Sequence, residues 1–279
     1  GIDHLDWRML QQRRRLTQAG AYLSVYSGTG EDANIASGRL AFVLGLHGPS
    51  VCFNTACSSA LVALHSSVAA IRTDECGSAL VAGTRAILLP FPLADLYAVD
   101  GRCKSFDKRA DGYGRSEGVG AAHLGDGALV VISGCAVRAG GRSASLTAPN
   151  GSALGRTIRA ALLSASTATL NCVQAQGLGS AMADPIEASA LHSVAVEAPE
   201  SRMAIGCHKP NVGHSEAASG MLGLLTAQHA IRMSAVSSNA QLRVLNHLVW
   251  QSVRPSSFVV PLNAYAGHEL KGCGVTAFG

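Results

Sequence analysis

Short apolar runs alternate with helix-like segments along most of the chain, and this alternation constrains the fold more than any other feature. The apolar runs have the length and residue types of β-strands and lie at residues 22–26, 51–53, 79–83, 118–124, 128–137, 171–175 and 203–206. The helix-like segments lie at residues 7–18, 58–72, 156–166, 184–194 and 215–233. This order predicts an α/β fold in which helices cover both faces of a mixed sheet.

Two of the predicted helices refine this architecture. Segments 58–72 and 215–233 carry few charges, and in segment 58–72 the apolar side chains recur every three to four residues. Such helices suit a layer that is enclosed between two sheets. Elsewhere, Gly-Asp-Gly at residues 125–127 predicts a turn that makes strands 118–124 and 128–137 neighbours.

The chain is expected to form one domain of two halves. The glycine pair at residues 140–141 marks the seam, and no Pro- or Ser-rich linker accompanies it. The first half would cover about residues 1–138 and the second about residues 139–279. Because the sequence starts without Met and stops at Phe278-Gly279, directly after a strand-like run, we expect the domain to be incomplete at both termini.

Composition limits the partners that the chain can have. Charged residues make up 14% of the chain, below the roughly 25% usual for soluble domains, which predicts a surface covered by a second copy. The only compact basic run, residues 13–15, is typical of a solvated helix face and argues against nucleic-acid binding. No apolar run approaches the roughly 20 residues of a membrane span. Eight cysteines without a C-x-x-C pair favour a reducing compartment, the cytoplasm.

An abrupt change from strand to helix at residues 53–61 places a cysteine at the bend. Small residues at positions 56, 58 and 59 let the backbone turn tightly there. A thiol at a helix N-terminus lies at the positive end of the helix dipole, which favours the thiolate and lowers the pKa. Cys57 is therefore a candidate nucleophile. The alternative is that Cys57 is one more buried small side chain, the usual environment of a free cysteine.

The second candidate segment spans residues 208–220 and delivers His214 to the start of a helix rich in small residues. A helix N-terminus disfavours imidazolium, so we expect His214 to be neutral and able to donate one hydrogen bond. Lys209 precedes it and would anchor the loop or supply positive charge. A lone histidine is more often structural, and it is the company of Cys57 that favours a catalytic interpretation.

Two rival motifs carry weaker functional signals than the Cys57 and His214 segments. Gly114 to Gly118 fits G-x-S-x-G, which would make Ser116 the nucleophile of a serine hydrolase, but that motif needs a strand before it and a helix after it. The Gly-rich segment 28–33 loosely matches a dinucleotide fingerprint, yet its two carboxylates would lie where a pyrophosphate binds, so we expect a turn. No cysteine–histidine grouping has zinc-finger spacing, and we expect no metal.

Five segments, in order along the chain, resemble the ketosynthase (β-ketoacyl synthase) domains of modular type I polyketide synthases. Residues 55–61, around Cys57, are similar to the nucleophile segment, and residues 209–218 are similar to the second histidine motif around His214. Residues 100–118, 146–151 and 184–187 resemble three further family segments. The resemblance implies a thiolase-like layered α/β fold of two similar halves and a homodimer.

The resemblance also implies a two-step reaction. An acyl group moves from the phosphopantetheine arm of an acyl carrier protein to Cys57, and a malonyl-type extender then loses carbon dioxide and attacks that thioester. His214 would hydrogen-bond the extender's thioester oxygen as its enolate forms. Phe278 matches a phenylalanine that gates the substrate. No cofactor is expected to bind directly, and neighbouring synthase domains such as an acyltransferase would be partners.

One position departs from the family pattern. Gln176 stands where the family has its first catalytic histidine. A glutamine amide donates a hydrogen bond but does not shuttle protons, and loss of a positioned acid or base commonly costs about 10²- to 10⁴-fold in rate. We therefore expect a domain that accepts and passes on acyl chains but condenses them poorly. Full condensation and an inactive structural or docking role stay open as alternatives.

Overall fold

The computed structural model describes residues 5–17, 26–89, 97–145, 147–165, 170–195, 203–253, 258–263, 265–266 and 270–278. Its helices are α1 (Leu5–Thr17), α2 (Ser27–Glu31), α3 (Asn34–Leu44), α4 (Ser59–Arg72), α5 (Gly151–Leu163), α6 (Ala183–Ala195), α7 (Lys209–Val212), the 3₁₀ turn η1 (Glu216–Ala218), α8 (Ser219–Met233) and α9 (His247–Ser252). Its strands are β1 (Ala79–Arg85), β2 (Gly118–Leu124), β3 (Cys172–Gln174), β4 (Met203–Gly206), β5 (Ala235–Val236), β6 (Phe258–Val259), β7 (Tyr265–Ala266) and β8 (Cys273–Val275). In these ranges no helix has the length and apolar character needed to cross a bilayer.

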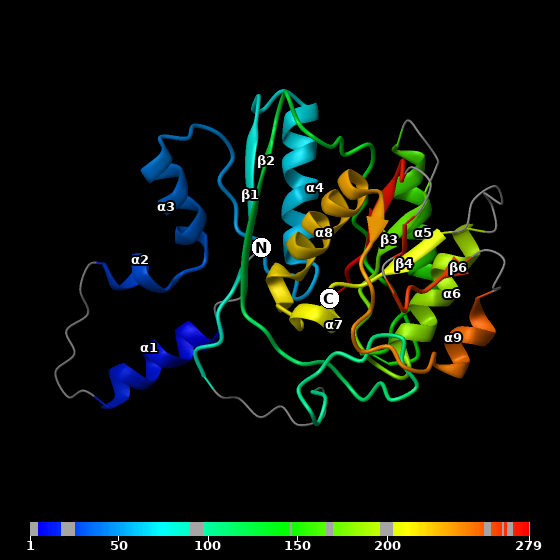
Figure 1. Ribbon diagram of the computed structural model, residues 1–279. Helices are drawn as coiled ribbons and strands as arrows, with labels where there is room; N and C mark the ends of the chain where they lie inside the picture. The colour runs from blue at the N-terminus through cyan, green and yellow to red at the C-terminus, as the bar shows by residue number, and fades with distance from the viewer. Residues whose placement is uncertain are drawn as a thin grey trace.

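The strands of the second half form a parallel sheet in the order β6-β4-β3-β8. Strand β3 is central, and its Cys172 lies opposite Ala204 of β4 on one side and opposite Cys273 of β8 on the other. Strands β1 and β2 form a separate antiparallel pair on the other side of the molecule (Figure 1). Parallel strands are normally covered on both faces, and the buried residues of β3 and β4 agree with this rule.

Helices α4 and α8 lie between the β1–β2 pair and the parallel sheet (Figure 1). Val81 of β1 packs with residues of α4 and α8, including Met221, in one buried cluster. On the other side, Ala230 of α8 packs with Cys172 and Ala204 of the parallel sheet. A Cβ at Gly220 would lie 2.7 Å from the Leu61 side chain, so the absence of a side chain lets α8 approach α4 closely. The prediction of an enclosed helix layer is confirmed.

Helices α5, α6 and α9 cover the opposite face of the parallel sheet (Figure 1). Val173 of β3 and Ile205 of β4 belong to one buried cluster with Ile158 of α5, Leu191 of α6 and Val249 of α9. This cluster holds β3 and β4 firmly, and both strands run directly into the loops that carry the predicted site residues.

Two predicted strands are wrong. Residues 51–53 form no strand and pair with no other strand in the described part of the chain. Residues 128–137 form no strand, and the ladder partner of β2 in the described residues is β1, with Ala79 opposite Leu124. Side chains bind the backbone of this segment instead: Arg72 donates to the Ser133 carbonyl, and the Cys135 N–H donates to a serine after α5.

Two further expectations need correction. Instead of one mixed sheet, the described strands form a parallel sheet and two antiparallel pairs, β1–β2 and β5–β7, and helices α4 and α8 separate β1–β2 from the parallel sheet. The Gly-rich segment expected to be a turn contains the short helix α2. The predicted strand at residues 22–26 lies almost wholly outside the described residues.

Candidate active site

A tight bend before α4 positions Cys57. Ala56 has φ +50°, a left-handed backbone conformation that is uncommon for a residue with a side chain. The hydroxyl of Ser59 accepts a hydrogen bond from the Thr55 N–H and donates to the Ala56 carbonyl, at 2.8 and 2.6 Å. These bonds close the tight turn that the small residues at positions 56, 58 and 59 predicted.

Cys57 and His214 meet in this bend although 157 residues separate them in the sequence. The Cys57 Sγ and His214 Nε2 atoms are 3.0 Å apart. His214 is fully buried, and the Tyr113 ring packs edge-on against its imidazole at 4.8 Å between ring centres. Backbone bonds fix the histidine from both sides, because its N–H donates to the Gly114 carbonyl and its carbonyl accepts from the Ser116 N–H. The pairing places a nucleophile next to a base.

His214 is neutral. Burial is the largest cause that holds the pKa of His214 well below its usual value, and the positive charge of Lys209 acts in the same direction. The buried Nδ1 has no hydrogen-bond partner in the described residues, so no carboxylate there favours imidazolium. The lowered pKa favours the predicted neutral state, with burial rather than the helix N-terminus as its main cause.

The expected low pKa of Cys57 is wrong. Burial raises the pKa of the Cys57 thiol, and the nearby charge of Lys209 offsets this only in part. The dipole of α4 acts on a thiol that is largely shielded from water, and desolvation of the thiolate outweighs it. In the resting site a protonated thiol therefore lies next to a neutral imidazole, so that His214 Nε2 can accept the thiol proton when the sulfur attacks.

Lys209 and Gln176 form a second buried pair. Gln176 lies just after the end of β3. Lys209 is the first residue of α7, and two residues separate it from the end of β4. The Lys209 ammonium donates to the Gln176 backbone carbonyl and, at 3.2 Å, to its side-chain Oε1. The amide Nε2 of Gln176 donates to the Phe278 carbonyl at 3.4 Å. The structure therefore brings Gln176, Lys209 and Phe278 together. The amide keeps a second N–H, and a hydrogen bond with Gln176 is among the causes that lower the pKa of Cys57 against the larger effect of burial.

Glu187 is a site residue to which the sequence reasoning gave no role. This buried carboxylate accepts hydrogen bonds from the Gln176 and Gly177 N–H groups, each at 2.8 Å, and from the Thr276 hydroxyl at 2.6 Å. It thereby joins the exits of β3 and β8. A signal was present, because Asp184-Pro-Ile-Glu187 places two carboxylates three residues apart on one face of a helix start.

The serine of the rival motif has the wrong surroundings for a hydrolase. Ser116 is followed directly by strand β2 instead of a helix. Its buried Oγ has no hydrogen-bond partner among the described residues. No geometry of a nucleophile elbow is present at this position.

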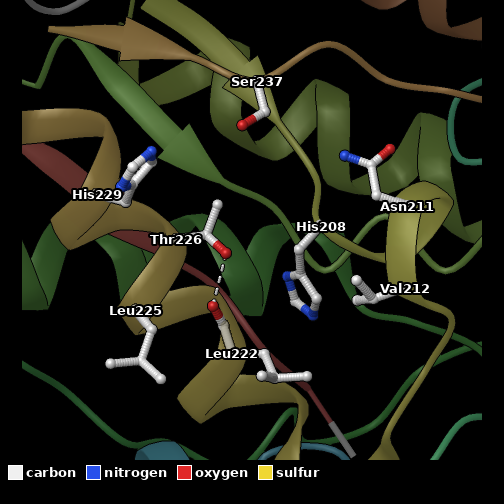
Figure 2. Close-up of a pocket in the computed structure, with 8 residues that line it drawn as sticks. All are labelled: His208, Asn211, Val212, Leu222, Leu225, Thr226, His229 and Ser237. Carbon is white, nitrogen blue, oxygen red and sulfur yellow. Dashed lines mark hydrogen bonds between the residues drawn. The ribbon is translucent and has the colours of Figure 1, made fainter. Parts of the chain in front are cut away.

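A cavity of about 320 Å³ lies beside α7 and α8. Figure 2 shows His208 and His229 among its lining side chains, with Thr226 bonded to the Leu222 carbonyl. Burial lowers the pKa of His208 to about 2, so this imidazole is neutral. None of the predicted site residues lines this cavity. Across the described ranges, no three His, Cys, Asp or Glu side chains gather in a way that would hold a metal ion.

Comparison with known proteins agrees with this geometry. Residues 1–126 match the N-terminal domain and residues 129–243 the C-terminal domain of the β-ketoacyl synthase family. The mycoketide-CoA synthase of Mycobacterium tuberculosis is 38% identical over 274 residues, which cover 91% of this chain and 7% of that protein. The erythronolide synthase EryA3 of Saccharopolyspora erythraea is 37% identical over 273 residues, 91% of this chain and 9% of that protein.

Solved ketosynthase structures have the same fold. An oxazolomycin ketosynthase domain from Streptomyces albus superposes with a TM-score of 0.81 at 28% identity, covering 95% of this chain and 47% of that one. The ketosynthase from module 6 of the bacillaene synthase of Bacillus subtilis gives a TM-score of 0.77 at 26% identity, covering 88% of this chain and 48% of that one. The chain belongs to the β-ketoacyl synthase family and has the thiolase-like layered fold of polyketide-synthase ketosynthase domains. It spans less than a tenth of the two synthases compared above.

Proposed function

We propose that this chain forms the acyl-transfer centre of a polyketide-synthase ketosynthase, with the acyl group carried as a thioester on Cys57. The observation that carries the proposal is the 3.0 Å separation between the Cys57 Sγ and the Nε2 of a neutral, buried His214. A neutral base beside a thiol is the arrangement that nucleophilic catalysis by cysteine requires.

The transfer step follows from these two groups. The Cys57 sulfur attacks the carbonyl carbon of a carrier-bound thioester while His214 Nε2 accepts the thiol proton. The tetrahedral intermediate then breaks its bond to the carrier sulfur, and that sulfur takes the proton from His214. The product is an acyl group on Cys57 and a free phosphopantetheine thiol, with no net change in charge. Tyr113 packs against the imidazole and keeps it in line with the sulfur.

The condensation step is expected to be slow. In the family pattern the first histidine also assists the reaction, and in this chain Gln176 occupies its position. Its amide donates one hydrogen bond to the Phe278 carbonyl and accepts one from the Lys209 ammonium, but an amide does not shuttle protons. We infer that His214 alone hydrogen-bonds the extender's thioester oxygen. Loss of the other positioned group would lower the condensation rate by about 10²- to 10⁴-fold.

Ordinary condensation is the second candidate, and Lys209 favours it. Its ammonium is buried beside Gln176, and a cation stabilises negative charge on an enolate oxygen in a site that excludes water. Under this alternative the cation compensates for the missing histidine. A catalytically inactive structural or docking domain is the third outcome, and the experiment below separates all three.

The partners of this centre are proposals as well. We infer that an acyl carrier protein delivers the substrates on its phosphopantetheine arm and that an acyltransferase domain loads the extender. A second copy of the chain would cover apolar side chains such as Phe42 and Val43 of α3, which are 88% and 77% exposed.

The test compares the full-length protein with its Gln176→His variant. Each is incubated with an acyl-carrier thioester and then with malonyl-carrier protein, and the products are followed by mass spectrometry. We expect both proteins to acquire the acyl group, and the histidine variant to extend it about 10²- to 10⁴-fold faster. Equal extension rates would favour condensation assisted by Lys209, and no acyl adduct on either protein would favour the inactive domain.

A further inference from the structure

Two cysteines outside the active site face each other across the parallel sheet. Cys172 of β3 and Cys273 of β8 are directly opposite in the strand register, so their side chains lie on the same face of the sheet. Their Sγ atoms are 2.6 Å apart. Unbonded atoms of this size rarely approach so closely, whereas a disulfide bond measures about 2.05 Å.

The remaining cysteine contacts in the described part of the chain are of a different kind. Cys52, Cys103 and Cys207 have hydrogen bonds to backbone carbonyls, and Cys135 contacts the His65 ring. The 172–273 pair is therefore the one described place where two thiols are each other's partner. All eight cysteines are in the thiol form.

The backbone already has the spacing that a disulfide needs. Neighbouring strands lie about 4.8 Å apart, and disulfide-linked residues usually have Cα atoms about 4.4 to 6.8 Å apart. Cys172 is completely buried, whereas Cys273 is partly exposed, so a small oxidant reaches the pair from the Cys273 side. Closing the bond requires a rotation of side chains rather than a movement of strands.

We propose that Cys172 and Cys273 are a redox modification site, which a hydroperoxide converts into an intramolecular disulfide. The hydroperoxide oxidises the Cys273 thiol to a sulfenic acid and is itself reduced to an alcohol, or to water in the case of hydrogen peroxide. The Cys172 sulfur then attacks the sulfenic sulfur, forms the S–S bond and releases one water molecule. A dithiol reductant of the thioredoxin class reverses the change by thiol–disulfide exchange.

A disulfide at this position would link β3 and β8, the two strands that lead to Gln176 and Phe278. Beyond the pair, β3 leads to Gln176 and β8 leads to Thr276 and Phe278. The Thr276 N–H donates to the Gln174 carbonyl, and Gln176 bonds to the Phe278 carbonyl. A covalent link a few residues upstream fastens the two strand exits to each other.

Formation of the disulfide is slow. The hydrogen bond from Cys172 and burial hold the pKa of Cys273 well above that of a free thiol, so little of the reactive thiolate is present near neutral pH. Oxidation of the pair is therefore expected to be slower than that of a thiol with an ordinary pKa.

The experiment is redox peptide mapping of the full-length protein. The protein is treated with excess hydrogen peroxide, blocked with an alkylating agent under denaturing conditions and digested without reductant. We expect a cross-linked peptide that joins residues 172 and 273 and weighs about two hydrogen atoms less than its two parts. Dithiothreitol should abolish the cross-link. This readout does not depend on the proposed acyl-transfer function.

Variants and controls make the outcome decisive. The Cys273→Ser variant should lose the cross-linked peptide, and the matched Cys135→Ser variant should keep it. A Cys57→Ala protein should also keep it, which shows that the active-site thiol is not the route of oxidation. The proposal is overturned if both thiols at 172 and 273 stay fully alkylated after hours in peroxide, or if either cysteine pairs with a different partner. Neither result requires the variants to fold.

Discussion

Replacing Glu187 with glutamine removes the carboxylate that joins the exits of β3 and β8. In the native protein Oε1 accepts from the Gln176 N–H and the Thr276 hydroxyl, and Oε2 accepts from the Gly177 N–H. A glutamine keeps one acceptor oxygen and turns the other position into an NH₂ group, which donates only. At least one of the three donors must therefore lose its acceptor.

The smallest loss occurs when the amide oxygen takes the place of Oε1, because the Gly177 N–H alone is then unpaired. A buried donor without a partner costs about 1–3 kcal/mol, and the two remaining bonds are weaker because hydrogen bonds to a neutral acceptor have about half the strength. We expect the free energy of local opening at the two strand exits to fall by about 2–4 kcal/mol. At about 1.4 kcal/mol per factor of ten, this corresponds to roughly 30- to 700-fold faster amide exchange.

The measurement is hydrogen exchange of the full-length protein, followed by mass spectrometry of peptides that cover residues 172–178 and 273–278. A pH of about 8 keeps the carboxylate more ionised, since burial raises the pKa of Glu187. Glu75→Gln is the matched control, because Glu75 is exposed and its variant should exchange like the parent at these peptides. If Glu187→Gln also exchanges like the parent, the three hydrogen bonds do not hold the strand exits and the reasoning is refuted.

Two further predictions concern His214. Because the pKa of His214 lies well below its usual value, the imidazole stays in the base form on acidification. The rate of acyl loading, measured by mass spectrometry of samples quenched at set times, should therefore not fall between about pH 7.5 and about pH 5.5. A decline centred near pH 6.5 would contradict a buried neutral imidazole. Gly213 has φ +80°, and a Cβ at this position would lie 2.8 Å from the Ser116 Cβ. Gly213→Ala should therefore displace His214, destabilise the loop that carries it by about 2–4 kcal/mol and slow the acyl loading of Cys57. Gly140→Ala meets open space and should load at the parental rate, and equal rates for the two variants would show that the loop tolerates a side chain at position 213.

The sequence predicted those elements whose signals are local. Strand β4 was predicted with its observed bounds, and helix α4 within one residue, because apolar spacing and small residues at the bend report directly on backbone conformation. The enclosed layer of α4 and α8 followed from their lack of charge. The meeting of Cys57 with His214 came from family resemblance, since no periodicity relates residues 157 positions apart.

The failed predictions depend on tertiary contacts. Residues 128–137 have an apolar composition suited to a strand, but side chains from the ends of α4 and α5 bind their backbone instead, and local composition does not report such contacts. The pKa of Cys57 was predicted from the helix dipole alone, whereas burial by distant segments decides its direction. The acceptor role of Glu187 was missed for the same reason, because one of its donors, Thr276, lies 89 residues further along the chain.

The acyl-transfer role of Cys57 and His214 is tested most directly by the intact mass of the full-length protein after brief exposure to an acyl-carrier thioester. We predict one acyl adduct that maps to the peptide containing Cys57, disappears in Cys57→Ala and forms about 10²- to 10⁴-fold more slowly in His214→Gln. Cys135→Ala, in which the other cysteine–histidine pair is broken, should acquire the adduct at the parental rate. An adduct that persists in Cys57→Ala, or that forms equally fast without the imidazole of His214, would contradict the assignment of this pair as the acyl-transfer centre.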